Sequence, residues 1–261
     1  MSDRIFTFAN SSDLALISKL LKSCDLPHED ISAHLSHFVV AKKDNRIVGT
    51  IGLEAYGKAG LLRSLAVAGG SRGNGIAKDL YDRLLAHAHL LGIDEIYLLT
   101  TTTTTAAEGF FAKRGFQREE RGNLPEAIRN TGEFQSLCPV TALPMRKDIR
   151  GEARYFPKEL LQLEPDVPGA AMWGVALEKT MFTYFEVEPG CRFEPHTHES
   201  EQITMVLEGE LCFAMEGRTV RLNQGEVIAI PSNLPHAVFT EKISAKAVDA
   251  WSPVMGKYKK Q

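Results

Sequence analysis

The period of the hydrophobic pattern changes along this chain, and the change limits the folds open to it. In the first part, helical segments such as residues 76–92 alternate with β-rich runs. Beyond about residue 175 the helical period is gone, and short β-rich runs recur between turn signals such as Glu208-Gly209. With 261 residues, 44% of them hydrophobic, the chain can bury two cores. We therefore predict two domains, an α+β domain at residues 1–147 and an all-β barrel or sandwich at residues 148–261.

The first domain is expected to alternate strands and helices. Apolar residues at helical spacing follow Ser12 and Asp13, either of which can cap the helix. Two β-rich runs flank a turn at residues 43–45 and predict a hairpin. A strand at residues 60–67, a glycine-rich loop and an amphipathic helix that stops at Gly92 come next. The remaining predicted elements are a strand at residues 95–100, a helix at residues 106–116 and a strand near residues 141–145.

Charge and cysteine content restrict the partners. The formal net charge of −3, without a polybasic tract, argues against nucleic acid and against an anionic membrane surface. No apolar run approaches the roughly 18 residues of a spanning helix, and residues 2–4 carry no signal pattern. The four cysteines form no C-x-x-C pair, which is typical of reduced thiols. We expect a cytoplasmic protein that acts on a small molecule.

The glycine-rich loop at residues 69–75 lies between a strand and a helix. Glycines let backbone N–H groups approach an anion at the positive end of a helix, so the layout suits a phosphate. The P-loop pattern is absent, and the Rossmann pattern lacks its early position. The residues Arg72-Gly73-Asn74-Gly75-Ile76-Ala77, preceded by the strand LLRSLAVA, resemble the R-x-x-G-x-[GA] loop of GNAT-family acetyltransferases. This resemblance covers residues 1–147.

The GNAT resemblance implies that acetyl-CoA is the cofactor. In that family the loop amides bind the pyrophosphate, and the preceding strand splays from its neighbour so that its backbone pairs with the pantetheine arm. The segments GLEAYG, LLRSLAV, AEGFFAKRGF and EFQSLCP are similar to a narrower branch, the arsenic-resistance and acetylglutamate synthase-like N-acetyltransferases, which implies a small amino-acid-like amine as acceptor. The resemblance assigns acetyl-CoA binding to Leu65, Ala66, Val67, Arg72, Gly73, Asn74, Gly75, Ile76 and Ala77.

Acetyl transfer needs a base, because only a neutral amine attacks the acetyl group. Glu54, on the strand expected to pair with LLRSLAV, is the candidate, with an ordinary ion-pairing role as the alternative. Arg63 and Ser64 lie one strand away, where an arginine suits an acceptor's carboxylate or an arsonate-like anion, or simply the surface. Many GNAT enzymes use a tyrosine on the helix that here carries Phe110 and Phe111, so we expect solvent to protonate the thiolate.

Two histidine-containing patterns in the second half resemble the cupin motifs. The first, G-x5-H-x-H-x3-[EQ]-x6-G, comprises Gly190, His196, His198, Gln202 and Gly209. The second, G-x5-P-x4-H, comprises Gly225, Pro231 and His236. The resemblance implies a jelly-roll barrel, and the run HTHESEQITMVLEGEL is similar to small cupins of the pectin-degradation type.

The spacing of these residues predicts a metal site. Residues two apart on a strand point to the same side, so His196 and His198 can share one ion, and Gln202 and His236 are expected to complete the set. Glu201 is an alternative third ligand, but the x6 spacing favours Gln202. A neutral amide in place of the usual glutamate leaves more positive charge on the ion. Three histidines suit a divalent Zn, Ni, Mn or Fe ion.

Three hypotheses for function remain open on the sequence. The first is an acetyl-CoA-dependent N-acetyltransferase fused to a metal-binding cupin of unknown reaction. In the second, the cupin is a non-catalytic sensor that regulates acetylation. In the third, the cupin is the main catalyst, an isomerase or dioxygenase, and the GNAT domain only binds acyl-CoA. Because cupins often pair through strands, we also expect a homodimer.

Overall fold

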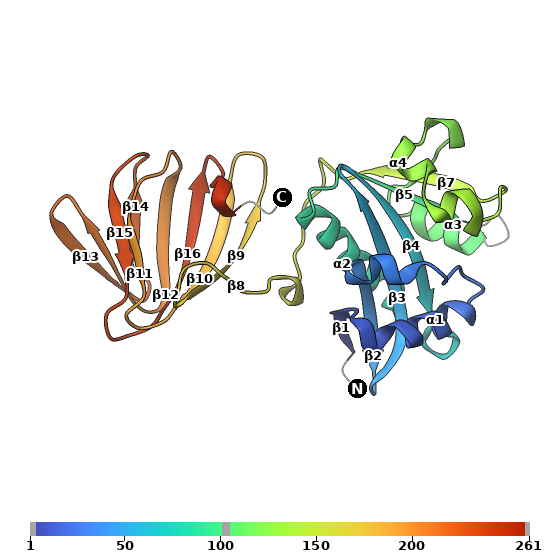
Figure 1. Cartoon of the computed structure of the whole chain (residues 1–261), viewed down its shortest axis with the longest axis horizontal. Helices are drawn as coiled ribbons and strands as arrows, with labels where there is room; N and C mark the ends of the chain where they lie inside the picture. The colour runs from blue at the N-terminus through green and yellow to red at the C-terminus, as the bar shows by residue number, and fades with distance from the viewer. Residues whose placement is uncertain (1–3, 101–104, 259–261) are drawn as a thin grey trace. The chain divides into compact units, whose positions relative to one another are not determined.

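The computed structural model describes residues 4–100 and 105–258 (Figure 1). The chain divides into two compact units, Met1–Leu160 and Leu161–Gln261. This division falls later than the boundary expected after residue 147. The reason is that Ile149 is completely buried in the core of the first unit, and Glu159 forms an ion pair with Arg83 at 2.5 Å. The expected α+β and all-β classes of the two units are confirmed.

The first unit is built on one twisted sheet. Its strands follow the order β1-β2-β3-β4-β5-β7-β6, and β4 and β5 are the parallel pair within it. Apolar, β-branched runs form the central strands, which are buried on both faces. The strands are β1 (Ile5–Phe8), β2 (Phe38–Lys43), β3 (Arg46–Tyr56), β4 (Ala59–Val67), β5 (Glu95–Thr100), β6 (Gln117–Arg118) and β7 (Leu143–Asp148).

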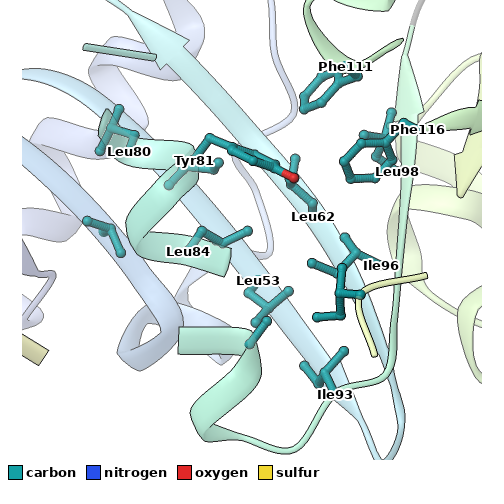
Figure 2. Packing of buried hydrophobic residues seen from close by; sticks show 14 of the residues in the cluster. Leu53, Leu62, Leu80, Tyr81, Leu84, Ile93, Ile96, Leu98, Phe111 and Phe116 are labelled. Atoms are coloured by element: carbon teal, nitrogen blue, oxygen red, sulfur yellow. The ribbon is translucent and has the colours of Figure 1, made fainter. Parts of the chain in front are cut away.

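Helices cover both faces of this sheet. On one face, Leu80 and Leu84 of α2 pack against Leu53, Leu62 and Ile96, as Figure 2 shows. On the other face, α1 and the 3-10 segment η2 bury a second cluster around the ring of Phe38. The helices are α1 (Leu14–Lys22), η2 (Ile31–His37), α2 (Ile76–Leu90), α3 (Thr105–Ala112) and α4 (Glu126–Arg129), with a π-helical turn η5 (Glu133–Leu137).

The predicted hairpin is β2–β3, and its turn residues Asp44 and Asn45 both have positive φ, as short polar turn residues allow. Asp13, one of the two predicted caps, occupies the N-cap position of α1 but makes no side-chain cap hydrogen bond there. Its carboxylate accepts from the backbone N–H of Asn10, which caps the short helical turn ahead of α1, and pairs with Lys42 at 2.8 Å. No helix within the described ranges is long and apolar enough to cross a membrane.

The second unit is an antiparallel barrel of two curled sheets. Its long strand β12 (Glu201–Met215) belongs to both sheets, since its first half pairs with β14 and β16 and its second half with β13 and β15. The sequence had suggested two separate strands here, broken at Glu208-Gly209. The other strands are β8 (Glu164–Pro165), β9 (Ala170–Ala176), β10 (Met181–Val187), β11 (Arg192–His196), β13 (Arg218–Asn223), β14 (Val227–Ile230), β15 (His236–Phe239) and β16 (Ala245–Ser252).

Gly209 marks the bend in β12. It has φ +75°, and a Cβ at this position would lie 1.8 Å from the carbonyl oxygen of Ser244. Only glycine allows both this backbone conformation and this approach of two strands. The chain therefore continues from one sheet into the other without a break in β12.

Candidate acetyl-CoA cleft and candidate metal centre

Strand β4 separates from β5 halfway along its length. The parallel pairing ends with Leu62 opposite Leu98, after which β5 continues beside β7 while β4 continues beside β3 alone. The predicted pantetheine-binding residues Leu65 and Ala66 lie on this separated part, together with Val67. Backbone groups on that edge are therefore free of strand pairing in the described structure, as the resemblance predicted.

A β-bulge lies where β4 begins to separate. Gly52 pairs with Arg63 and Thr50 pairs with Ala66, so Ser64 and Leu65 together lie opposite one residue of β3. Ser64 has φ +58°, a left-handed conformation that is uncommon outside glycine. Bulges of this kind bend a strand and increase its twist, which accounts for the separation from β5.

The glycine-rich loop follows β4 directly and leads into α2. Gly73 and Gly75 both have φ +79°, and a Cβ on either would meet no atom within 4 Å. The loop is thus open to a ligand, and it turns the first N–H groups of the 15-residue helix α2 outward at its positive end. Arg72 donates through Nε to the carbonyl of Val67 at 3.0 Å, so this side chain stabilises the loop itself.

A cleft of about 760 Å³ opens between the separated strands. Its floor includes Arg63, Ser64 and Leu65 from β4 and Leu98 from β5. Phe111, on the helix where many GNAT enzymes carry a tyrosine, lines the cleft with its apolar ring. The volume is of the size that holds a cofactor arm and a small acceptor together.

In the second unit, the three predicted histidines converge at the end of the barrel. Ligand nitrogens of His196, His198 and His236 lie within 4.8 Å of one another. Each ring is oriented by a hydrogen bond from its Nδ1 to a backbone carbonyl. Nδ1 of His196 donates to the carbonyl of Glu194 at 2.7 Å. Nδ1 of His198 donates to the carbonyl of Ser200 at 2.6 Å, and Nδ1 of His236 donates to the carbonyl of Leu234 at 2.9 Å. A carbonyl only accepts, so Nδ1 is the donor in each ring, and Nε2 is the nitrogen that each ring offers to an ion.

Gln202 lies beside this cluster, with Oε1 3.2 Å from Nε2 of His198. Its amide orientation is fixed by a chain of hydrogen bonds, in which Nε2 donates to Thr204 at 2.9 Å and Thr204 donates to the buried carboxylate of Asp249 at 2.5 Å. The adjacent Glu201 is exposed. The structure therefore directs Gln202, and not Glu201, toward the histidines.

The donor set fits a divalent cation. Nε2 of His236 is buried without a hydrogen-bond partner in the described residues, and Nε2 of His198 faces another lone-pair-bearing atom of Gln202. Metal-binding histidines usually donate their other ring N–H to a carbonyl or carboxylate, as every Nδ1 does here. Trp251 lies next to the cluster, with its ring centroid 5.2 Å from that of His198, and donates to Thr183 at 2.8 Å.

Comparison with known families agrees with both units. Residues 10–116 match the acetyltransferase (GNAT) family, and residues 183–249 match the cupin domain. The chain joins a GNAT acetyltransferase domain to a cupin domain. Both predicted resemblances are thereby confirmed at the level of the domain families.

The relatives of the GNAT domain include an amino-acid acetyltransferase and an uncharacterized N-acetyltransferase. An amino-acid acetyltransferase of Ralstonia nicotianae is 32% identical over 108 residues, which are 41% of this chain and 23% of the relative. An uncharacterized N-acetyltransferase of Chlorobaculum tepidum is 30% identical over 101 residues, 38% of this chain and 62% of the relative. The chain thus spans less than two thirds of the length of either curated relative.

Solved structures resemble each domain separately. N-acetylglutamate synthase from Neisseria gonorrhoeae, complexed with coenzyme A and N-acetyl-glutamate, aligns with a TM-score of 0.49 and 22% identity over 57% of this chain and 35% of that one. KdgF from a Halomonas species aligns on the cupin side with a TM-score of 0.38 and 23% identity, over 40% of this chain and 97% of that one.

Beneath the cleft of the GNAT domain, Arg63 is the centre of a buried ion-pair network. Its guanidinium contacts Asp30 at 2.6 Å, Glu54 at 2.5 Å and Glu133 at 2.8 Å, and only 4% of the residue is exposed. Three carboxylates raise the pKa of Arg63 despite its burial. An acceptor carboxylate would therefore have to replace one of these partners in order to bind Arg63.

Glu54, the predicted base, is held firmly within this network. Its Oε1 accepts from Arg63, its Oε2 accepts from the Tyr56 hydroxyl at 2.6 Å, and His34 lies 3.7 Å away. Only 1% of Glu54 is exposed, and it does not line the cleft directly. Burial and the neighbouring Glu54 carboxylate raise the pKa of Tyr56.

Glu133 was not singled out from the sequence, although it opens the quoted segment EFQSLCP. Its carboxylate lines the cleft, 6% of the residue is exposed, and burial raises its pKa. The thiol of Cys138 donates to it at 2.8 Å, and burial together with Glu133 raises the pKa of that thiol to about 12. The only sequence signal for Glu133 is its place at the start of the segment EFQSLCP, directly before Phe134.

Proposed function

We propose that this chain transfers the acetyl group of acetyl-CoA to the amine of a small, amino-acid-like acceptor. The main support is the separation of β4 from β5, which opens a cleft along the strand edge. The open glycine loop that follows β4 and leads into α2 is the second support. The pantetheine arm would pair with Leu65 to Val67, and the pyrophosphate would lie at the start of α2. The amino-acid acetyltransferase relative supports an amino-acid-like acceptor.

The residues around the cleft have defined tasks in this proposal. The amine nitrogen forms a bond with the acetyl carbon, the carbon–sulfur bond breaks, and the amine loses a proton to a carboxylate. Glu54 and Glu133 are the two candidates for that carboxylate. Glu133 reaches the cleft directly, whereas Glu54 would require a relay through a water molecule. Ser64, held in the bulge, remains the candidate contact for the acceptor.

The decisive experiment measures CoA release by the full chain. Acceptors include glutamate and phosphinothricin-like amines, and the variants are Glu54→Gln and Glu133→Gln, with the exposed Glu120→Gln as the matched control. Loss of the base is expected to lower kcat by roughly 10²–10⁴-fold, while the control keeps the wild-type rate. If calorimetry detects no acetyl-CoA binding to the full chain even at millimolar ligand, the acetyltransferase proposal fails.

For the cupin domain we propose a mononuclear divalent metal site held by His196, His198, His236 and Gln202. A bound ion supplies Lewis acidity and would leave coordination positions for water or a ligand. The neighbouring cavity measures only about 40 Å³ and is lined mainly by apolar side chains such as Phe185 and Phe213. Two hypotheses for the cupin are catalysis and ligand sensing. If the cupin is a sensor, binding of its ligand changes the acetylation rate and the ligand is not converted. If the cupin is a catalyst, the ligand is converted to product.

The cellular setting belongs to the same proposal. All four cysteines are free thiols, and acetyl-CoA is an intracellular metabolite, so we propose a cytoplasmic enzyme.

A further inference from the structure

We propose that Tyr258 is a displaceable plug of the cupin cavity, and that the molecule which binds there is a hydroxyl-bearing aromatic ring that takes its place. Tyr258 belongs to the 3-10 turn η7 (Gly256–Tyr258), which follows β16 and is the red helical turn in Figure 1. Its ring lines the small cavity beside the histidine cluster, together with Phe185 and Trp251. The turn η7 therefore contributes one wall of this cavity.

The cavity is too small for an organic ligand while Tyr258 is in place. It measures about 40 Å³, which is room for a few water molecules, because one water needs roughly 10–15 Å³. The centroid of the Tyr258 ring lies 5.7 Å from that of Phe185, in an edge-to-face arrangement, and 6.0 Å from that of Trp251. Outward movement of this ring would add a space of the size of one ring, with aromatic walls, to the cavity.

Few contacts hold η7 against the barrel. The Tyr258 hydroxyl donates to Oδ2 of Asp166 at 3.1 Å, and Nζ of Lys257 lies 2.7 Å from Oδ1 of the same carboxylate. Gly256 and Lys257 are exposed. Segments with few buried contacts open at a small part of the free energy of global unfolding. The turn can therefore lift away while the barrel stays folded.

Asp166 indicates what a displacing ligand must carry. Only 5% of its side chain is exposed, and within the described residues both side-chain donors to it, Lys257 and Tyr258, come from η7. When the turn lifts, this carboxylate loses both donors, which costs free energy unless the ligand supplies a new one. An aromatic ring with a hydroxyl group replaces both the packing and the hydrogen bond of Tyr258.

The alternative is that Tyr258 is a fixed wall of the barrel. A fixed wall predicts that variants which keep the ring bind a ligand no better than the wild type. A plug competes with the ligand, so the apparent affinity is reduced by the fraction of molecules in which the cavity is open. Loosening the turn without removing the ring should then raise the affinity.

Binding of para-fluorophenol to the metal-free full chain, followed by fluorine NMR, tests this proposal independently of the metal site. Lys257→Ala removes the ion pair with Asp166 and keeps the ring, so the affinity should rise roughly two- to fivefold. Tyr258→Phe loses only the hydroxyl, and we expect a rise of roughly fivefold. Tyr258→Ala removes the plug and should bind at least about tenfold more tightly than the wild type.

The matched control is Tyr155→Ala, because Tyr155 is 66% exposed and belongs to the first unit. Circular dichroism of each variant establishes that it is folded. Para-fluorotoluene, which has no hydroxyl, should bind Tyr258→Ala roughly fivefold more weakly than para-fluorophenol does.

If Lys257→Ala and Tyr258→Phe bind para-fluorophenol no better than the wild type, Tyr258 is a fixed wall and the proposal is overturned. A folded Tyr258→Ala that does not bind the probe contradicts it as well, and so does an equal gain in Tyr155→Ala. Equal affinities for the two probes would contradict the hydroxyl-bearing class of ligand. The supporting outcome is a graded rise in affinity that is confined to the η7 variants and is larger for para-fluorophenol.

Discussion

At the scale of single residues, the proposed metal site depends on which of two neighbouring side chains, Glu201 or Gln202, points toward the histidines. Gln202 is buried beside His198, whereas Glu201 is exposed. We therefore expect Gln202→Ala to weaken binding of Zn²⁺, Ni²⁺ or Mn²⁺ by roughly tenfold or more and His236→Ala by at least about a hundredfold. Glu201→Ala should leave the affinity unchanged. Calorimetric titration of metal-free protein measures these affinities, and equal losses for Gln202→Ala and Glu201→Ala would disprove the assigned frame.

A buried histidine of the GNAT domain makes its stability depend on pH. His89 is 6% exposed, neither ring nitrogen has a hydrogen-bond partner in the described residues, and burial and the charge of Arg154 lower its pKa to about 4. The unfolded chain binds this proton near pH 6.5. The unfolded state therefore holds more protons between these values, and the free energy of unfolding falls as the pH decreases through that window.

Between pH 7 and pH 4, we expect the free energy of unfolding of the wild type to fall by about 2 kcal/mol more than that of His89→Leu. Urea denaturation followed by the helical circular dichroism signal measures it, because the described α-helices all lie in the GNAT domain. If His89→Leu loses as much stability at low pH as the wild type does, the pH dependence comes from other groups.

The sequence predicted the histidine cluster but not the ion-pair network, and the difference is physical. The cupin ligands follow from strand periodicity and a short local pattern, so spacing alone brings His196 and His198 together. The partners of Arg63 come from segments distant in sequence, Asp30 before β2 and Glu133 after α4. Only the packing of those segments on the sheet brings them to one guanidinium, and no local pattern encodes that.

At the scale of elements, the bend in β12 depends on one glycine. Gly209→Ala places a methyl group on the backbone of Ser244 and also forces a positive φ, so it should destabilise the cupin domain by more than about 3 kcal/mol. Gly217 has a similar φ of +74° but open space around it. Gly217→Ala should therefore cost only about 1 kcal/mol. Denaturation monitored by the β-sheet circular dichroism signal compares the two, and similar losses would rule out the steric contribution.

Long periodic elements were predicted well and short ones were not. The helix that became α2 and the hairpin β2–β3 carry strong periodicity or turn residues, and both lie where expected. Strand β1 and the short helix α4 were missed, because four residues contain too little of either period to be distinguished from a loop. The separation of β4 from β5 was expected from the family resemblance, while the Ser64 bulge that produces it is visible only in the register.

At the scale of the whole molecule, the position of the domain boundary has a measurable consequence. A fragment that ends at residue 147 lacks Ile149, which is fully buried, and Glu152, which lies 2.9 Å from the buried Lys147. We expect residues 1–160 to fold stably and residues 1–147 to be destabilised by about 3 kcal/mol or more, from the lost core side chain and the unpaired ammonium. Thermal denaturation of the two fragments compares them, and equal stability would favour the earlier boundary.

The position of Trp251 gives the cupin domain an optical reporter of its own. The chain has two tryptophans, Trp173 and Trp251, and both belong to this domain. Because the indole of Trp251 lies against the ring of His198, an open-shell ion such as Ni²⁺ at the histidines should quench its emission, while closed-shell Zn²⁺ should not. A fluorescence titration can thus follow metal binding at the cupin site in the intact chain. The GNAT domain has no tryptophan, so it adds no tryptophan emission to this signal.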